Sequence, residues 1–320
     1  AAVGVLRAHA EAGGPPRDLV LVDWADEEGA RFGRSLFGSS CMSGNFDPDE
    51  LRQLRDRDGV TLEEAVRAHG VELDRALEAR AQLRNAAAYL ELHIEQGPVL
   101  ESLGLPLGVV LGTFGVERHR ITWRGQAAHA GSTPMDKRRD ALAGAAKLAL
   151  EIRDIARRTG DGAVCTCGGV VCRPGIVTSV VETAEQLLDQ RHLDAGKLAS
   201  MLQQAKDASA RFAEEENIEV SWERIWNIEP ILFHPDLIEL ADQAVRETCG
   251  TSHRLPSGPL HDAAEVCRAG VPTVMLFVQS LRGISHNKIE DTREEHLEYA
   301  VQALDRLATK TMAWIEQGSA

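Results

Sequence analysis

The alternation of apolar and polar positions divides the chain into short buried runs and longer amphipathic stretches. Short apolar runs bounded by turn residues, the pattern of buried strands, lie at 19–26, 86–94, 105–111 and 272–278. Amphipathic stretches predict helices in pieces over 48–83 and again over 235–249, 261–269 and 294–317. Strands that alternate with helices in this way predict an α/β fold, with a mixed sheet in a three-layer α/β/α arrangement.

The middle of the chain has a different order of elements. A half-exposed strand is expected at 118–124, a helix at 140–158, strands at 163–171 and 176–189, a helix at 195–215 and a strand at 218–226. This order is that of a split β-α-β sandwich with one antiparallel sheet. We therefore expect an α+β (ferredoxin-like) domain at 113–224, inserted between the two parts of the first domain, 1–112 and 225–320.

Composition narrows the class of protein. The 320 residues carry 49 acids against 35 bases, and this net charge of −14 argues against a nucleic-acid binder, because phosphate binding needs a basic face. No apolar stretch is long enough to predict a membrane span. The six cysteines are scattered, which is typical neither of a disulfide scaffold nor of a standard zinc site. They indicate a reducing compartment, the cytoplasm.

Polar residues of metal-ligand type follow three of the predicted strands. Asp26-Glu27-Glu28-Gly29 follows the first, His93 ends the second, and His286 comes shortly after the run at 272–278. Each alone is more often a solvated acidic turn or an ordinary histidine. Their repetition at strand ends favours a site, because ligands of open α/β sheets bind there. Imidazole and carboxylate suit zinc, manganese or cobalt, and a neighbouring acid can serve as general base.

Five motifs add a resemblance to a known family. They are the runs 24–32 (WADEEGARF), 92–98 (LHIEQGP), 125–135 (GQAAHAGSTPM), 189–192 (DQRH) and 283–286 (GISH). In this order they resemble the N-carbamoyl-L-amino-acid hydrolase group, which includes allantoate amidohydrolases and β-ureidopropionases. That group belongs to the dinuclear-metal aminopeptidase-like hydrolases.

The resemblance implies a role for residues near the predicted strand ends. Glu27 matches the general base. Glu28 and His286 match two ligands of one metal ion. His93 matches a ligand of the second metal. The implied cofactors of the complete protein are two divalent ions, zinc, manganese, cobalt or nickel.

The resemblance also implies residues that handle the substrate. His129 matches the histidine that reaches a partner subunit's site and stabilises the oxyanion, and Arg191 matches the arginine that grips the substrate carboxylate. His261, followed by Asp262, matches a pair that lines the pocket. Two further positions are implied to contact substrate: Gln96 and Thr178. Many relatives have an Asn near Thr178, and either Thr178 or Ser179 takes its place here.

The expected activity is hydrolysis of the carbamoyl C–N bond of N-carbamoyl-L-amino acids to amino acid, carbon dioxide and ammonia. Allantoate, N-carbamoyl-β-alanine or a dipeptide is the alternative substrate. An alternative of another class is a dimeric binding protein that has lost its metal centre. The inserted domain implies that two copies of the chain form a homodimer. The expected small-molecule partner is the substrate, a ureido acid.

The start of the chain departs from the family pattern. Residues 1–6 are already apolar at helical spacing, with no capping residue before them. The family's first motifs, which supply one histidine ligand and the aspartate that bridges both metals, would lie just before Ala1. We therefore expect that the N-terminal part of the first domain is missing, and that this polypeptide alone binds metal weakly and has little activity.

Overall fold

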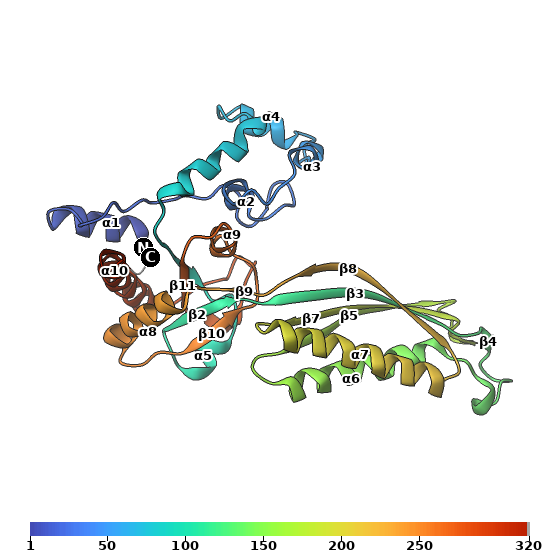
Figure 1. The fold of residues 1–320 in the computed structure, drawn as a ribbon. Coiled ribbons are helices and arrows are strands. Elements are labelled where there is room, and N and C mark those ends of the chain that lie inside the picture. Colours follow the sequence, from blue (N-terminus) through green and yellow to red (C-terminus); the bar gives the residue numbers. More distant parts are fainter. Residues whose placement is uncertain (319–320) are drawn as a thin grey trace. The chain divides into compact units, whose positions relative to one another are not determined.

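The computed structural model describes residues 1–318 and divides the chain into two compact units. The split unit consists of Ala1–Thr113 and Ile231–Ala320, and the inserted unit is Phe114–Pro230 (Figure 1). The expected boundary between 224 and 225 falls inside a strand, β8 (Glu219–Ile228), because that strand continues to pair with its neighbour as far as Ile228.

The split unit is built on a mixed sheet. Its strands are β1 (Tyr89–Ile94), β2 (Leu107–Thr113), β9 (Ile231–Leu232), β10 (Arg254–Ser257) and β11 (Thr273–Val278). The order is β1-β11-β2-β10, with β9 also paired to β2; β1 runs parallel to β11, and β11 runs antiparallel to β2. All six residues of β11 are buried, so both faces of the sheet are covered. The predicted mixed α/β architecture is confirmed.

Helices of the split unit bury the sheet. They are α1 (Ala2–Glu11), α5 (Val99–Leu103), α8 (Pro235–Cys249), α9 (Asp262–Arg268) and α10 (Glu294–Glu316), with a 3-10 turn at η3 (Leu281–Gly283). Helices α8 and α10 pack on each other and on the sheet, and their apolar faces join the strands in one core. Helix α9 packs instead against β1, β9 and β11. This placement matters for function because α9 begins directly after His261.

The segment between α1 and β1 differs from expectation at one place. The run 19–24 forms no strand, and Val20 is 80% exposed. Its apolar β-branched residues favour a strand, but a strand exists only where a neighbouring chain pairs with its backbone. No such neighbour pairs with it within residues 1–318.

The rest of this segment forms a small helical layer. Its elements are α2 (Phe37–Ser43), α3 (Pro48–Gln53), α4 (Leu62–Arg67) and η1 (Leu73–Asn85). Helix α4 begins at the predicted capping box, in which Thr61 and Glu64 exchange hydrogen bonds. A separate cluster that includes Phe37, Leu51 and Leu73 holds the layer together. Helix α2 packs on α9, and this contact connects the layer to the sheet.

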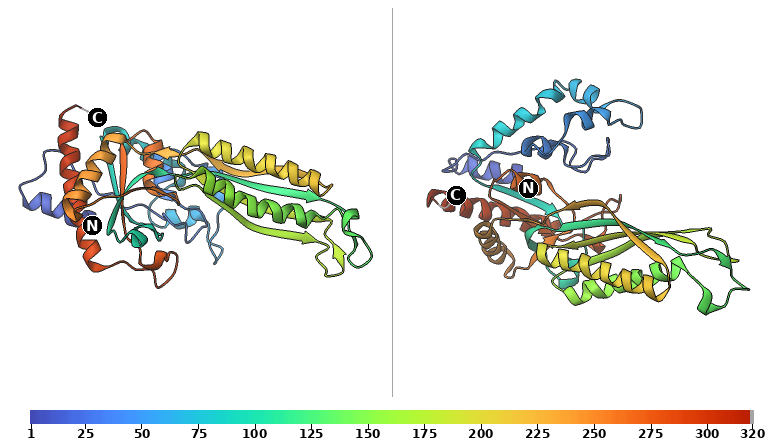
Figure 2. Two further views of the ribbon diagram at one scale, coloured as in Figure 1. Left: turned by 90° about the horizontal axis from the view of Figure 1, so that it is seen from below. Right: turned by 45° about the vertical axis from the view of Figure 1, so that its right-hand side comes forward.

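The inserted unit has the predicted ferredoxin-like order. Its elements are β3 (Gly115–Arg124), β4 (Ala128–His129), η2 (Met135–Lys137), α6 (Ala141–Thr159), β5 (Val164–Arg173), β6 (Ser179–Val180), β7 (Thr183–His192), α7 (Ala195–Glu215) and β8. The four long strands form an antiparallel sheet in the order β5-β7-β3-β8. Helices α6 and α7 pack side by side on this sheet (Figure 2). The strand expected at 176–189 is two strands, because the β4–β6 pair interrupts it.

Within residues 1–318, no helix combines the length and the apolar composition that crossing a membrane requires.

Candidate active site

The two acids of the first motif lie in a tight turn. The Leu36 amide donates to the Glu27 carbonyl at 2.8 Å, and the Gly38 amide donates to the Ala25 carbonyl at 2.9 Å. Gly29 has φ of +66°, and a Cβ there would lie 2.4 Å from the Ser35 nitrogen. Only glycine fits this close approach of two backbone segments. The turn is thus held by residues 35–38 rather than by a sheet.

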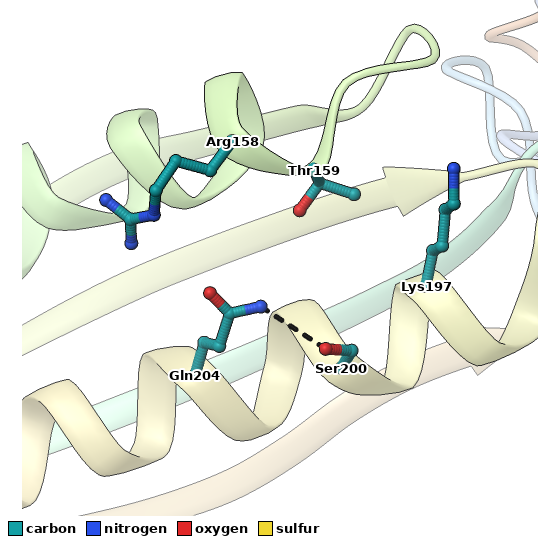
Figure 3. A pocket seen from close by; sticks show the side chains of 5 residues that line it. All are labelled: Arg158, Thr159, Lys197, Ser200 and Gln204. Atoms are coloured by element: carbon teal, nitrogen blue, oxygen red, sulfur yellow. Dashed lines mark hydrogen bonds between the residues drawn. The ribbon is translucent and has the colours of Figure 1, made fainter.

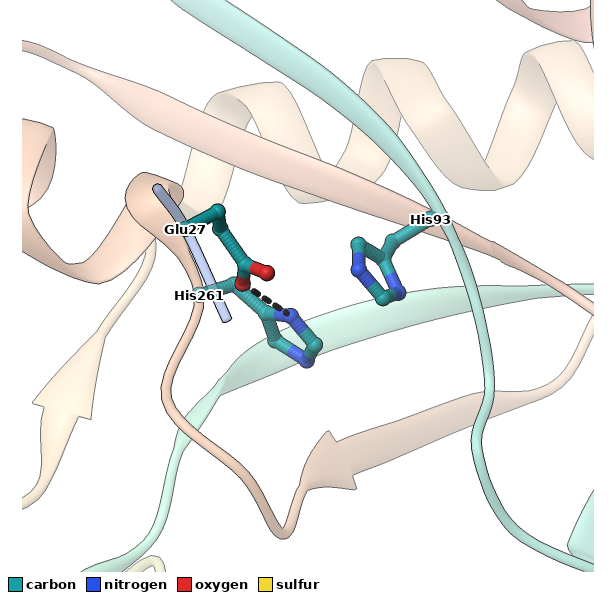
Figure 4. Close-up of side chains that lie close together, drawn as sticks. All are labelled: Glu27, His93 and His261. Carbon is teal, nitrogen blue, oxygen red and sulfur yellow. Dashed lines mark ion pairs between the residues drawn. The ribbon is translucent and has the colours of Figure 1, made fainter. Parts of the chain in front are cut away.

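Glu27 lies in a cluster with two histidines from different elements (Figure 4). His93 is on β1 and His261 directly precedes α9; one ligand atom of each of the three residues lies within 4.8 Å of the others. The Glu27 Oε1 atom is 3.8 Å from Nδ1 of His261, and the two imidazole rings are 4.2 Å apart. Strand β1 and helix α9 therefore bring together the predicted base, a predicted metal ligand and a predicted pocket residue.

The environment sets the charges of this cluster. The neighbouring His261 imidazole, with help from His93 and His286, holds the pKa of the Glu27 carboxyl below its usual range. Burial lowers the pKa of the His261 imidazole, against the opposing effect of the Glu27 carboxylate. At neutral pH, Glu27 is therefore ionised and His261 is uncharged. His261 is only 1% exposed, and neither ring nitrogen has a hydrogen-bond partner among the described residues.

A second group contains the other predicted ligands. The Glu28 Oε2 atom lies 3.0 Å from Nε2 of His286, and the Gln96 side-chain amide donates to Glu28 Oε1 at 3.3 Å. The structure thus brings Glu28 and His286 together, as the shared role requires. Gln96, expected to contact substrate, holds Glu28 in this structure, because its own backbone is anchored by the Ser280 hydroxyl.

Strained backbone is concentrated around these groups. Asp26, Leu36, Gln96 and His286 have φ between 52° and 59°, a left-handed conformation that non-glycine residues rarely adopt. Each lies at or next to a residue of the site. Such strain persists only where surrounding contacts enforce it, and it is typical of functional sites.

The remaining predicted residues belong to the inserted unit. His129 on β4 is exposed, and its Nδ1 accepts a hydrogen bond from the Gly131 amide at 3.1 Å. The Thr178 carbonyl accepts from the Ala130 amide at 2.8 Å, so Thr178 and His129 lie in the same small β4–β6 element. Arg191 is on β7.

Arg191 is held in a fixed orientation by a carboxylate. Its Nε donates to Asp189 Oδ1 at 2.7 Å and its Nη2 donates to Asp189 Oδ2 at 3.2 Å. Asp189 also accepts from Arg118 Nε at 2.7 Å, and these hydrogen bonds help to keep the pKa of its carboxyl low despite partial burial. The planar guanidinium of Arg191 is of the type that binds carboxylates through two parallel hydrogen bonds.

Sequence reasoning missed two residues beside the site, Ser39 and Glu91. Glu91 accepts hydrogen bonds from the Tyr89 hydroxyl and the Ala263 amide, each at 2.8 Å, and burial raises the pKa of its carboxyl to about 7. Burial likewise raises the pKa of Asp262, which Ser39 contacts, to about 7. An acid in the middle of an apolar strand was the available signal for Glu91; Ser39 carried none.

The inserted unit has a hollow of about 340 Å³ between the end of α6 and the start of α7 (Figure 3). Five polar residues line it: Arg158, Thr159, Lys197, Ser200 and Gln204. Both cations are paired, Arg158 with Glu151 and Lys197 with Asp161. No predicted site residue lines this hollow, and we assign it no role.

Acids and imidazoles that lie together beside a mixed α/β sheet, with an inserted ferredoxin-like unit, are the features of a metal-dependent hydrolase. Comparison with known proteins agrees. The model of peptidase family M20/M25/M40 matches residues 1–310, and the chain belongs to this family. Hydrolases of this family are dinuclear metal enzymes.

The relatives are hydrolases that act on amide bonds. The chain is 36% identical over 286 residues to an N-carbamoyl-L-amino acid amidohydrolase of Geobacillus stearothermophilus, covering 89% of this chain and 69% of the relative. It is 34% identical to an allantoate amidohydrolase of Escherichia coli, covering 94% and 72%. A crystal structure of a hydantoinase/carbamoylase family amidase from Burkholderia multivorans matches with a TM-score of 0.85 and 32% identity, covering 97% and 74%. The resemblance inferred from the five motifs is confirmed.

Proposed function

We propose that this protein hydrolyses the carbamoyl C–N bond of N-carbamoyl-L-amino acids. The observation that carries the proposal is the cluster of Glu27, His93 and His261, which joins a candidate base to a candidate metal ligand and a candidate pocket residue. The 36% identity to an N-carbamoyl-L-amino acid amidohydrolase supports this substrate class. The products are the free amino acid and carbamic acid, which decomposes to carbon dioxide and ammonia.

The residues present fit divalent metal ions. The donors are carboxylate and imidazole, and the buried His261 nitrogens have no hydrogen-bond partner among the described residues. We assign Glu28 and His286 to one ion and His93 to the other, with zinc, manganese, cobalt and nickel as candidates. Bound ions supply Lewis acidity, which allows water to lose a proton near neutral pH.

The side chains then divide the remaining work. Ionised Glu27 accepts a proton from the attacking water and passes it to the leaving nitrogen, with the uncharged His261 imidazole 3.8 Å from its carboxylate. His129 donates a hydrogen bond to the oxyanion as it forms. Arg191, oriented by Asp189, binds the substrate carboxylate.

Allantoate is the second candidate substrate, because a relative with this activity in its name is 34% identical. Allantoate carries a carboxylate and ureido groups, so the roles assigned to Glu27, His129 and Arg191 apply to it as well. N-carbamoyl-β-alanine and dipeptides complete the set of amides to be compared. A non-catalytic binding protein is the alternative of another class, and retention of both Glu27 and Glu28 argues against it.

The experiment is an assay of ammonia release from each of these compounds, with zinc, manganese, cobalt or nickel added, by purified protein that also carries the histidine and aspartate motifs expected before Ala1. We expect the highest kcat/KM with an N-carbamoyl-L-amino acid, and loss of activity on chelation. Glu27→Gln removes the base and is expected to lower kcat by about 10²- to 10⁴-fold. A protein that releases no ammonia from any ureido acid with any of these metals would disprove the proposal.

We also propose that two chains form a dimer through the inserted unit. Its sheet has two edges, β5 and β8, and exposed apolar residues such as Val171, Ile225 and Trp226 lie on them. If His129 serves the partner's site, a mixture of Glu27→Gln and His129→Ala subunits regains part of the activity. A monomer in sedimentation experiments, or no recovery after subunit exchange, would contradict this arrangement.

The compartment that fits best is the cytoplasm. All six cysteines are free, although Cys165, Cys167 and Cys172 lie close together along one strand. Free thiols persist in a reducing environment. Cell fractionation with an antibody against the protein tests this assignment, and recovery outside the cytoplasmic fraction would refute it.

A further inference from the structure

Two short helices beside the site are joined by a buried hydrogen bond. The Ser39 hydroxyl on α2 donates to the Asp262 carboxylate at the start of α9. Ser39 is 0% exposed and Asp262 is 4% exposed, so water does not compete for this bond. One turn further along α2, the Ser43 hydroxyl donates to Glu265 at 2.6 Å. The two helices thus share two similar contacts, which differ in their distance from the site.

The Ser39 contact closes a ring of interactions that begins and ends at Glu27. The Glu27 carboxylate lies 3.8 Å from His261, and His261 is followed directly by Asp262. Asp262 binds Ser39, and α2, which carries Ser39, begins directly after Leu36. The Leu36 amide donates at 2.8 Å to the carbonyl of Glu27 itself. The Ser43 contact lies outside this ring.

The ring is one of the supports of the turn that carries Glu27, beside the Gly38–Ala25 backbone hydrogen bond and the 2.9 Å hydrogen bond from the Trp24 indole to the Tyr89 hydroxyl. The preceding segment, 19–24, pairs with no strand within residues 1–318, and Val20 is largely exposed. Leu36 has φ of 59°, a conformation that its neighbours must enforce. A catalytic base that is misplaced by about 1 Å can lose two orders of magnitude in rate. A fixed support for the turn therefore has a chemical purpose.

We propose that the Ser39–Asp262 hydrogen bond is a latch that positions the Glu27 carboxylate. Ser39 and Asp262 are positioning residues, since they act through Leu36 and His261 and do not touch the reacting atoms. The expected effect on catalysis rests on the proposed function, but the expected effect on the mobility of the turn does not. Breaking the latch frees the turn 25–38 even in the absence of substrate.

The test compares Ser39→Ala with Ser43→Ala in the full-length protein. The two changes remove one hydroxyl each from the same helix, but only the first opens the ring. Hydrogen exchange followed by mass spectrometry is expected to show at least tenfold faster exchange over residues 25–38 in Ser39→Ala. Ser43→Ala is expected to leave exchange in that segment unchanged. With substrate, Ser39→Ala lowers kcat about tenfold or more while KM changes less than twofold.

Two further variants keep the test decisive. Asp262→Ala removes the acceptor instead of the donor and is expected to reproduce the faster exchange, so a folding defect of one variant does not end the test. Asp262→Asn keeps an acceptor oxygen and is expected to restore slow exchange. The latch is disproved if residues 25–38 exchange equally fast in Ser39→Ala and Ser43→Ala. If the wild-type protein cleaves no ureido acid, the proposed function fails, and the exchange comparison still decides the latch.

Discussion

Glu91 offers a direct test of how burial controls charge beside the site. Its carboxyl lies inside β1 and accepts from the Tyr89 hydroxyl and the Ala263 amide through the same oxygen, Oε2. Burial raises the pKa of this carboxyl from 4.5 to about 7. In Glu91→Gln, the amide oxygen can accept both hydrogen bonds and the charge never forms. The variant therefore separates the cost of ionisation from the loss of contacts.

The sign of the effect follows from linkage. The folded protein binds the Glu91 proton more tightly than the unfolded chain does, so this contribution to stability is complete below pH 4.5 and is lost as pH rises through about 7. One pKa unit corresponds to about 1.4 kcal/mol, so the change from 4.5 to about 7 amounts to about 3 kcal/mol. Relative to wild type, Glu91→Gln is thus expected to gain about 3 kcal/mol in unfolding free energy between pH 4.5 and pH 8.

The assay is urea denaturation of the chelator-treated protein at several pH values, read by tryptophan fluorescence. Only the pH dependence of the difference between variant and wild type enters the comparison, so a constant effect of the substitution cancels. Glu219→Gln, at an exposed position of β8, is the control and is expected to follow wild type at every pH. A difference between Glu91→Gln and wild type that stays constant from pH 4.5 to pH 8 would refute the argument from burial.

Two further predictions concern Arg191 and Gly29. Arg191→Lys loses the fork that Asp189 orients, so KM for a ureido acid is expected to rise at least tenfold in steady-state assays while kcat changes little. Arg120→Lys, at an exposed ion pair with Glu223, is the control; equal effects of the two substitutions would contradict the assignment. Gly29→Ala forces a Cβ against backbone at φ of +66° and is expected to lower stability by about 1–3 kcal/mol in urea denaturation, whereas an unchanged midpoint would contradict the strained turn.

Local patterns were sufficient for the inserted unit. The long strands β3 and β7 each alternate between buried and exposed residues, and α6 and α7 present one apolar stripe each. These periods are local properties, so the sequence predicts them without knowledge of the fold. The strand expected at 176–189 was displaced because the short β4–β6 pair occupies its beginning, and pairing between distant segments leaves little local trace.

The same distinction explains the first motif. Residues 19–24 have the composition of a strand, yet they form none and residues 20–23 are exposed, because a strand needs a partner. Glu27 and Glu28 nevertheless reach the site, since the turn is held by contacts with residues 35–38 and His261 rather than by a sheet. Gln96 was expected from the sequence to contact substrate. In the structure its side-chain amide binds Glu28 instead, a partner that its position in the chain did not indicate.

The sequence by itself determined the family, the order of helices and strands apart from the runs 19–26 and 176–189, and the identity of the acids and histidines proposed to carry the chemistry. These properties depend on residue type and on spacing along the chain. Only the tertiary structure decided that His261 lies beside Glu27, that the surroundings raise the pKa of Glu91 and Asp262 to about 7, and that Ser39 joins α2 to α9. Protonation and orientation depend on burial and on neighbours from distant segments, and these exist only once the chain has folded.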